Sequence, residues 1–331
     1  MLTEKSKESL LQNGYIIFAS DYGKKAVAES WTVRLKKQVK QIDQFKPFQN
    51  YNIVTGGISL TVDVDLDCDE TRLLADSFLV PTASMFGRES TPKSHRLYKV
   101  IDLTKKHTRV FWDFKGATES MLVEMRANDH YTMCGGQYDN QEKVVWTSDG
   151  KPTEITYDAL FKSCAKLAVA SVLLRKSPMP GAKMRNEYWK LAIASMWYGK
   201  VEEEDCIQIV EAVTTAHNDD VKERLGRVHD IYKRDVTEQL EGLPTLAERF
   251  NWSDDEVKDF KKLLLKITGR HLLPTYTGEF VKRIAYMMKQ KKYYDLEDKE
   301  MYDGESIDIK YAKDFDGKYT PLKFWKLHKD R

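Results

Sequence analysis

The sequence predicts an α+β protein in which a mixed domain of strands and helices precedes an all-helical domain. The chain has 331 residues, which is long for one compact domain and favours two. Before residue 155, short runs rich in β-branched and aromatic residues are separated by Gly, Pro, Asn and Asp, as in strands joined by turns. After residue 155 the apolar residues follow a helical spacing.

Composition excludes several classes of protein. Hydrophobic residues make up 41% of the chain and charged residues 31%, as in ordinary globular proteins. No run of 18 uncharged apolar residues is present, so we expect no transmembrane helix and no membrane partner. The N-terminus carries charges where a signal peptide has its apolar stretch. The four cysteines are scattered without a C-x-x-C pair, which predicts no zinc ribbon and a reducing, cytoplasmic location.

In the first part of the chain, the pattern predicts strands at residues 14–18, 58–66, 96–101, 109–114, 121–126 and 144–146. Helices are expected there at residues 25–42 and 70–78. In the second part, a long Ala-rich helix over about residues 160–173 ends before Ser177-Pro178-Met179-Pro180-Gly181. Further helices are expected at residues 183–198, 202–215, 221–239 and 245–250, and after the N-cap residue Ser253. From residue 293 the chain turns acidic and aromatic, which indicates a short hairpin or an extended tail.

The most informative segment is a strand with an acidic residue at every second position. In residues 61–67, Asp63, Asp65 and Asp67 alternate with apolar residues, so the three carboxylates share one face of the strand. Neighbouring carboxylates on one face repel each other, and a cation between them removes that repulsion. Hard oxygen ligands at this spacing suit Mg²⁺ or Mn²⁺. A solvated polar face on an antiparallel strand is the alternative.

A second strand offers a further carboxylate. In residues 121–126, Glu124 and Arg126 share the polar face. Together with Asp63 and Asp65, Glu124 would complete a site for two divalent ions, one activating an attacking oxygen and the other stabilising the leaving group. Arg126 either holds phosphate oxygens or pairs with Glu124. Asp67 lies one step further along the first strand, and we expect it to be a bystander.

Between the two acidic strands lies a segment suited to a triphosphate. His95 stands in a turn that enters a strand, beside Lys93, Ser94 and Arg96. Basic side chains neutralise phosphate, while hydroxyl and imidazole groups donate hydrogen bonds to it. These four residues, with Arg126, are therefore the candidates for binding a triphosphate.

The order of these residues resembles the archaeo-eukaryotic primase superfamily, and within it the bifunctional primase-polymerases of phages and plasmids. In that family a T-G turn leads into a D-h-D strand, followed by a short motif ending in His and by a third acidic residue. The matching residues here are, in order, Thr55-Gly56, Asp63, Asp65, His95 and Glu124. The resemblance covers about residues 10–160, and a weaker resemblance extends into the helical part.

The resemblance implies an RRM-like α/β catalytic domain over residues 1–158 and a helical accessory domain over residues 159–290. Residues 291–331 would form a tail or linker, which in relatives leads to a helicase domain. The implied activity is that of a DNA primase-polymerase, a nucleotidyltransferase in phage or plasmid replication within a prokaryotic cytoplasm. It would transfer nucleotides from NTP or dNTP to a 3′-hydroxyl, with de novo primer synthesis and extension. Two Mg²⁺ or Mn²⁺ ions would be held by Asp63, Asp65 and Glu124. The implied partners are single-stranded DNA template, primer, nucleotide and a helicase in the same chain or another.

The chain departs from the family pattern at two points. The middle motif is usually Ser-x-His, whereas here Lys93 takes the place of the serine and Ser94 directly precedes His95. Many relatives also carry a zinc-binding stem, which the scattered cysteines do not provide. The sequence contains no G-x-x-x-x-G-K-[ST] loop, so these residues include no helicase motor.

Three other readings compete with a primase-polymerase. A polymerase-β-like nucleotidyltransferase places a helical turn between Gly-Gly and D-h-D, but only five residues separate Gly57 from Asp63 here. A two-metal nuclease would require Lys where Arg126 stands. A non-catalytic replication-initiator module would bind DNA without any dependence on divalent metal.

Basic residues suggest DNA contacts in two places, although the net charge of +2 gives no overall preference for nucleic acid. Residues 24–46 hold seven basic residues against two acidic ones, and other basic residues flank the helix break at residues 178–181. The candidates are Arg34, Lys36, Lys37, Arg175, Lys176, Lys183 and Arg185. Solvated helix surfaces are the alternative. We expect the helical region to assist priming more than extension, because starting a strand requires two nucleotides held without a duplex.

Overall fold

The structure is a computed structural model that describes residues 7–21, 49–115, 120–234 and 240–269, and three short strands between residues 284 and 302. The chain divides into two compact units, Met1–Gly269 and Arg270–Arg331. The second unit contains an antiparallel sheet of β11 (Ile284–Met287), β12 (Lys292–Asp295) and β13 (Glu300–Tyr302). The hairpin expected from residue 293 onward is therefore part of a three-stranded sheet that begins earlier in the chain.

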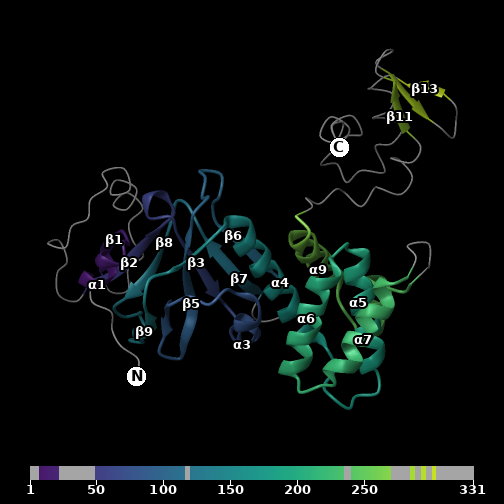
Figure 1. The fold of residues 1–331 in the computed structure, drawn as a ribbon, viewed down its shortest axis with the longest axis horizontal. Helices are drawn as coiled ribbons and strands as arrows, with labels where there is room; N and C mark the ends of the chain where they lie inside the picture. Colours follow the sequence, from purple (N-terminus) through teal and green to yellow (C-terminus); the bar gives the residue numbers. More distant parts are fainter. Residues whose placement is uncertain are drawn as a thin grey trace. The chain divides into compact units, whose positions relative to one another are not determined.

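The first unit is built on a seven-stranded sheet with the order β6-β7-β3-β5-β4-β9, in which β10 pairs with β5 (Figure 1). The strands are β3 (Thr61–Leu66), β4 (Ser84–Arg88), β5 (Thr91–Val100), β6 (Val110–Asp113), β7 (Met121–Arg126), β9 (Val144–Asp149) and β10 (Thr153–Ile155). Helix α3 (Asp69–Phe78) connects β3 to β4, and both strands are antiparallel to β5 between them. These three elements form a split β-α-β unit.

A smaller sheet covers one face of the larger one. Helix α1 (Lys7–Gln12) precedes β1 (Ile17–Asp21), which pairs with β2 (Gln49–Thr55), and β2 pairs with β8 (His130–Gly135). A 3₁₀ turn, Gly57–Ser59, leads from β2 into β3. Ile53 of the smaller sheet and Leu97 and Trp146 of the larger sheet are buried in one cluster. The two sheets therefore face each other.

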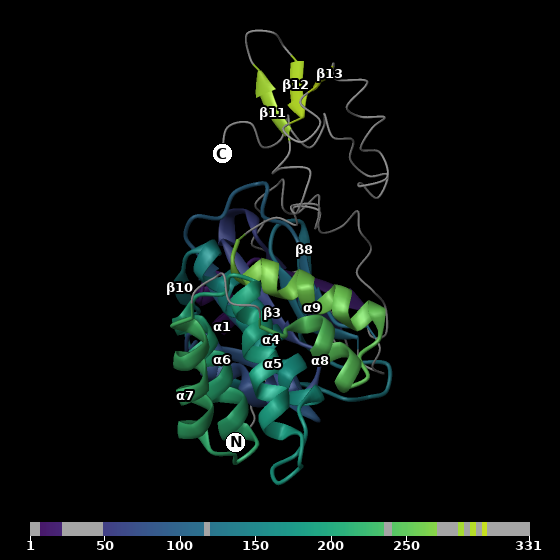
Figure 2. The same cartoon turned by 90° about the vertical axis from the view of Figure 1, so that its right-hand side faces the viewer.

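The remaining described helices lie on the opposite side of the larger sheet. They are α4 (Tyr157–Lys176), α5 (Arg185–Tyr198), α6 (Glu203–Ala216), α7 (Val221–Tyr232), α8 (Leu243–Arg249) and α9 (Asp254–Ile267). Of these, α4 contacts the strands, and the others pack mainly on α4 or on one another. Seen from the helical side, the helices lie side by side in front of the strands (Figure 2). Val62, Val64 and Leu66 of β3 are buried in one continuous core with apolar residues from these helices. The boundary expected at residue 158 thus falls in the first turn of α4, inside a unit whose sheet and helices share a core.

The α+β class is confirmed, and most expected elements occur within a few residues of their predicted bounds. Ser253 caps α9 as predicted: its Oγ accepts a hydrogen bond from the backbone N–H of Glu256 at 3.3 Å, and Glu256 accepts one from the N–H of Ser253 at 2.8 Å. The sequence did not predict β2, β4, β8 or β10 as strands. The helix expected at residues 25–42 lies outside the described residues.

Two further findings bear on the expectations from composition. Within the described part of the chain, no helix is both long enough and apolar enough to cross a lipid bilayer. Cys68, Cys134, Cys164 and Cys206 are all buried and free, so none of them forms a disulfide.

Candidate active site

The two acidic strands are neighbours at the centre of the larger sheet. Asp65 on β3 lies opposite Glu124 on β7 and, on its other side, opposite His95 on β5. In the next row, Asp63 lies opposite Arg126. These side chains are on the face toward the smaller sheet, because alternation sends the valines of β3 to the helical side. The sheet therefore brings together the four residues that carry the sequence motifs.

Arg126 lies among the carboxylates and bridges three of them. Its Nη2 is 2.6 Å from Asp65 Oδ2 and 2.8 Å from Glu124 Oε2, and its Nη1 is 3.1 Å from Asp63 Oδ2. Arg109, just before β6, also donates to Glu124 through Nε. Burial disfavours a charged guanidinium, but the surrounding carboxylates hold the pKa of Arg126 above its ordinary value. Of the two roles predicted for Arg126, the structure shows the ion pair with Glu124.

His95 is enclosed by carboxylates and an aromatic ring. Its Nδ1 is 3.0 Å from Asp63 Oδ2 and its Nε2 is 3.6 Å from Asp65 Oδ1, while the ring stacks on Phe86 with centroids 4.6 Å apart. Burial works against protonation, but the two aspartates raise the pKa of His95 above its ordinary value. Burial likewise opposes ionisation of Asp63, yet His95 and Arg126 lower the pKa of that carboxyl. Both ring nitrogens of His95 therefore face carboxylates.

Three carboxylates converge at the end of β3. One oxygen from each of Asp65, Asp67 and Glu124 lies within 4.8 Å of the other two. Oδ2 of Asp67 is buried and has no hydrogen-bond partner among the described residues. Burial and the neighbouring Asp65 raise the pKa of Asp67 to about 7. An all-carboxylate donor set with a buried oxygen lacking a partner fits Mg²⁺ or Mn²⁺.

This grouping differs from the one expected from the sequence. Asp67, expected to be a bystander, belongs to the group that could hold a divalent cation, together with Asp65 and Glu124. Asp63, expected to be a ligand, is fully buried and is engaged by His95 and Arg126. The two aspartates differ in their position along β3. Asp63 lies within the strand, whereas Asp67 stands just beyond its last residue.

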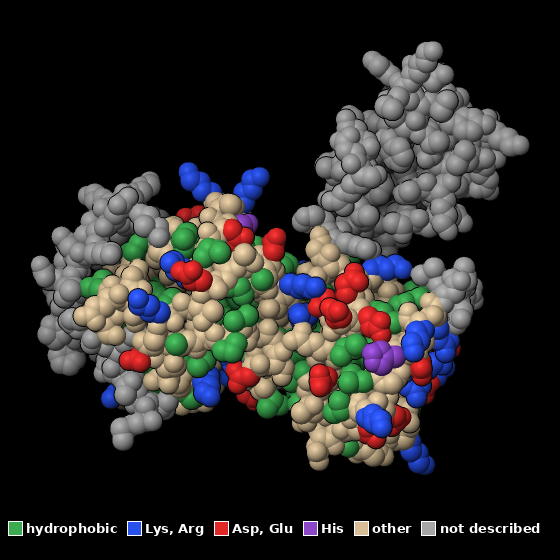
Figure 3. Space-filling view, in the orientation of Figure 1, with side chains coloured by type: hydrophobic (Ala, Val, Ile, Leu, Met, Phe, Trp, Pro, Cys, Tyr) green, Lys and Arg blue, Asp and Glu red, His purple; other side chains and the backbone are tan. Residues whose placement is uncertain are grey.

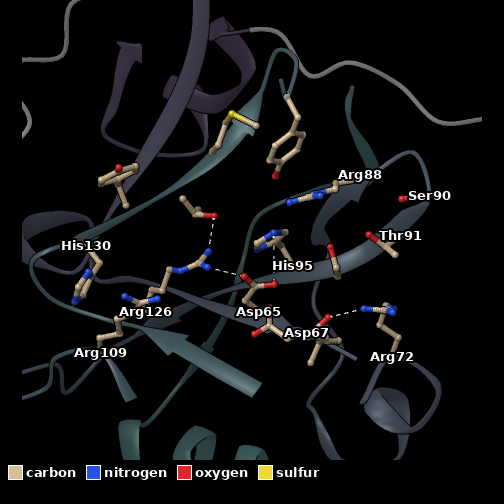
Figure 4. A pocket seen from close by; sticks show the side chains of 16 residues that line it. Asp65, Asp67, Arg72, Arg88, Ser90, Thr91, His95, Arg109, Arg126 and His130 are labelled. Carbon is tan, nitrogen blue, oxygen red and sulfur yellow. Dashed lines mark hydrogen bonds and ion pairs between the residues drawn. The ribbon is translucent and has the colours of Figure 1, made fainter. Parts of the chain in front are cut away.

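The carboxylates line a cavity of about 740 Å³. Figure 4 shows Arg88, Ser90 and Thr91 on one side of it and Arg109 and His130 on the other, with the acidic residues between. A cavity of this volume is in the range that binds small molecules and nucleotides. It combines an acidic centre with basic and hydroxyl groups, which is the combination that a metal-bound phosphate ester requires.

Only part of the segment around His95 reaches this cavity. Ser94 and His95 line it, whereas Lys93 is exposed outside its lining. Arg96 is buried on the helical face, where its Nη1 lies 2.7 Å from Asp76 Oδ1 of α3. The sequence predicted a turn before His95, but β5 begins at residue 91, and strand alternation sends Arg96 away from the cavity.

Three of the seven expected DNA-binding residues form ion pairs with carboxylates of the first unit. These pairs are Arg175–Glu70 at 2.8 Å, Lys176–Glu256 at 2.8 Å and Arg185–Asp219 at 2.7 Å. Lys183 is exposed, and the candidates Arg34, Lys36 and Lys37 lie outside the described residues. On the face of the molecule seen in Figure 3, Lys and Arg side chains are interspersed with Asp and Glu. The described residues on that face therefore do not form a uniformly basic surface.

Sequence reasoning missed three arginines at the cavity, Arg72, Arg88 and Arg109. Arg88 gave no signal, because the short run Ser84–Arg88 with Gly87 inside it does not alternate like a strand. Arg109 stands at the start of a strand that the sequence predicts. Its hydrogen bond to Glu124 depends on the pairing of that strand with β7, which the sequence does not show. Neither the family models nor the curated proteins compared with this sequence match it. The functional conclusion therefore depends on the site itself.

Proposed function

We propose that the protein is a DNA primase-polymerase of the kind that its sequence resembles, and that the cavity between the sheets is its nucleotidyl-transfer site. The observation that carries this proposal is the convergence of Asp65, Asp67 and Glu124 within 4.8 Å at the cavity. Carboxylates that hold divalent cations beside arginines and hydroxyls suit a nucleoside triphosphate, because its phosphates need both kinds of positive charge.

The strand order supports an RRM-like catalytic fold as part of the proposal. Along the chain, β3, α3, β4, β5 and β7 follow one another, and in the sheet they give the order β7-β3-β5-β4. A ferredoxin-like unit has a second helix before its last strand. Here the described residues between β5 and β7 form strand β6 instead of a helix. The split β-α-β half is thus present, and the second half is modified.

In the proposed reaction, a 3′-hydroxyl oxygen attacks the α-phosphate of an NTP or dNTP, the bond to the bridging oxygen breaks, and pyrophosphate leaves. Asp65, Asp67 and Glu124 would hold the cations, Mg²⁺ or Mn²⁺. Such ions lower the pKa of the attacking hydroxyl and stabilise the charge that develops on phosphate. Asp63 and His95 are positioning residues, because His95 contacts both aspartates and so orients Asp65.

Arg126 has a separate role in this proposal. It supplies the positive charge that allows several buried carboxylates to lie side by side in the folded protein. The hydroxyl proton released by the attack leaves to solvent through the open side of the cavity. The single-stranded template, the primer and any helicase partner belong to the proposal through the resemblance alone.

The test is template-dependent incorporation of a labelled nucleotide on single-stranded DNA, with and without a primer, in Mg²⁺ and separately in Mn²⁺. Asp65→Asn and Glu124→Gln should each reduce incorporation by roughly a thousandfold or more, because they remove charge that stabilises the transition state. Asp158→Asn is the matched control, since Asp158 is exposed in the first turn of α4. Absence of incorporation by the unaltered protein in both metals would overturn the proposal. Metal-dependent cleavage of the DNA without nucleotide would favour a two-metal nuclease.

A further inference from the structure

Six basic side chains line the cavity, and most of them are already paired. They are Arg72, Arg88, His95, Arg109, Arg126 and His130. Arg109, Arg126 and His95 face the buried carboxylates described above. Arg72 donates to Asp69 at 2.5 Å and to the backbone oxygen of Leu66 at 3.0 Å. Burial and the neighbouring Arg109 keep the pKa of His130 below its ordinary value, so this ring is mostly neutral at pH 7.

Arg88 differs from the other five. It is exposed at the end of β4, and among the described residues no carboxylate lies within ion-pair distance of it. Its guanidinium carbon lies 4.1 Å from the centroid of the Tyr138 ring, a cation–π contact that holds the side chain in place. Arg88 also forms a side-chain hydrogen bond with Tyr138, and without a carboxylate partner the guanidinium keeps its other planar donors for a ligand.

The hairpin between β4 and β5 places hydroxyl groups beside Arg88. Arg88 pairs with Thr91 across the hairpin, and Ser90 lies in the turn between the strands. The hairpin is tight, because a Cβ at Gly87 would lie 2.0 Å from the backbone oxygen of Thr91 and 2.7 Å from Ser94 Oγ. Glycine at position 87 therefore allows the two strands to approach closely, and Arg88, Ser90 and Thr91 line the same side of the cavity (Figure 4).

The charge is distributed unevenly around the cavity, and this determines on which side a polyphosphate should bind. On the side of Arg126 and Arg109 the positive charge is already balanced by Glu124 and the aspartates. On the side of Arg88, Glu142 accepts a hydrogen bond from the backbone N–H of Ser90 and lies near enough to interact electrostatically with Arg88, but no described carboxylate forms an ion pair with this arginine. Phosphate oxygens gain most from a guanidinium that forms no ion pair, since two parallel N–H donors can reach two oxygens of one phosphate.

We infer that Arg88, assisted by the hydroxyls of Ser90 and Thr91, binds the terminal phosphates of the nucleoside triphosphate. This inference rests on the proposed function and deepens it. It moves triphosphate binding from His95, which the sequence motif indicated, to a residue outside every motif. His95 then keeps the positioning role that its contacts with Asp63 and Asp65 give it.

The experiment measures binding of tripolyphosphate to the full chain by calorimetry, once in EDTA and once in Mg²⁺. Arg88→Ala should raise the Kd by roughly ten- to a hundredfold in both buffers, as expected for loss of a charge-assisted hydrogen bond. Arg88→Lys should show a smaller loss, because it keeps the charge but not the two parallel donors. Arg249→Ala is the matched control, since Arg249 forms its ion pairs with glutamates of the helical region and should leave the Kd unchanged.

Three results would overturn the inference: no binding of tripolyphosphate by the unaltered protein, an unchanged Kd in Arg88→Ala, or a larger loss in His95→Ala than in Arg88→Ala. Thermal melts of the same samples verify that each variant is folded, which the exposure of Arg88 favours. The outcome is separable from that of the proposed function. Arg88-dependent binding without any nucleotide incorporation would contradict the polymerase alone, whereas incorporation with an unchanged Kd in Arg88→Ala would contradict this inference alone.

Discussion

Arg126→Met tests whether the acidic cluster depends on a cation that the chain itself supplies. Methionine keeps much of the length and volume of the side chain but removes the charge and all donors. The carboxylates left behind cannot retreat into water, because the side chains of Asp63 and Glu124 are 0% and 2% exposed and that of Asp65 is 11% exposed. The substitution therefore removes the charge that bridges all three carboxylates, and leaves His95 beside the two aspartates and Arg109 beside Glu124.

The magnitude follows from the burial of these ion pairs. Removing one partner of a buried ion pair destabilises a protein by about 3–5 kcal/mol. In a unit of this size, 1 kcal/mol corresponds to about 2–4 °C, so the Tm should fall by roughly 6–20 °C. The Tm of Arg126→Lys should lie between that of the unaltered protein and that of Arg126→Met, because one ammonium group cannot bridge three carboxylates at once.

A divalent cation should restore much of this loss, since it replaces the missing positive charge. At a free Mn²⁺ concentration of about 100 times its Kd, binding to the folded state alone stabilises by about 2.7 kcal/mol. The assay is urea unfolding and thermal melting of both proteins in EDTA and in Mn²⁺. Arg249→Met is the control, and its exposed ion pairs are worth at most about 1 kcal/mol. A loss below 1 kcal/mol for Arg126→Met in EDTA, or equal stabilisation of both proteins by Mn²⁺, would refute the reasoning.

Four further predictions concern single charged residues. Asp67→Asn should stabilise the protein at pH 8 but not at pH 4, as measured by urea unfolding in EDTA. Its folded pKa of about 7 exceeds the ordinary value of 3.8, so the stability that protonated Asp67 contributes is full below about pH 4 and lost as the pH rises through 7. Asp219→Asn should flatten the loss of stability in acid. Although burial opposes ionisation, hydrogen bonds from Arg224 and Arg185 lower the pKa of Asp219 to about 2, so its contribution is full above about pH 4 and lost as the pH falls through 2. Arg185→Ala should destabilise by roughly 3 kcal/mol without changing the affinity for single-stranded DNA, because Arg185 is a buried ion-pair partner. Lys183→Ala should leave the stability unchanged. It should lower the salt slope of single-stranded DNA binding, measured by fluorescence anisotropy, by about 1, as expected for the loss of one phosphate contact from this exposed lysine.

Periodicity predicted several elements, including some that are buried on both sides. Met121–Arg126 and the helices after residue 155 have a regular apolar spacing, and the structure contains them close to the expected positions. Strand β2 was missed because it buries polar residues as well. Asn50 and Asn52 are 2% exposed and bond to Gln137 and Ser20, partners that are far away in sequence or on another strand. The hydrophobic pattern of a single strand carries no information about such distant partners.

The sequence predicted most of the acidic residues that form the site, but not which of them lie together. Alternation along two strands placed Asp63, Asp65 and Glu124 on one face, and the structure confirms that they share it. Which carboxylates converge depends on how far each lies from the end of its strand, and for this reason Asp67 joins the group while Asp63 does not. The role of Arg88 depends on a hairpin whose first strand has no pattern of its own.

The last prediction concerns a fragment that ends at residue 158. The sequence indicated a catalytic domain with this boundary, and an independent domain would fold and extend a primer without the helices. In the structure, Val62, Val64 and Leu66 are at most 1% exposed and share their core with α4 and the helices after it. Exposing a fully buried aliphatic side chain costs about 1.5–3 kcal/mol. Three such residues approach the whole net stability of a domain, about 5–15 kcal/mol.

The fragment 1–158 should therefore show no cooperative thermal transition and should bind a hydrophobic dye. The fragment 1–269, which matches the compact unit, is the control and should melt cooperatively. This expectation also decides how the helical region can be studied. If the helices are needed for folding, loss of priming after truncation carries no information, and exposed residues such as Lys183 must be substituted instead. A cooperative melt of fragment 1–158 together with primer extension would contradict the shared core and would place the domain boundary where the sequence predicts it.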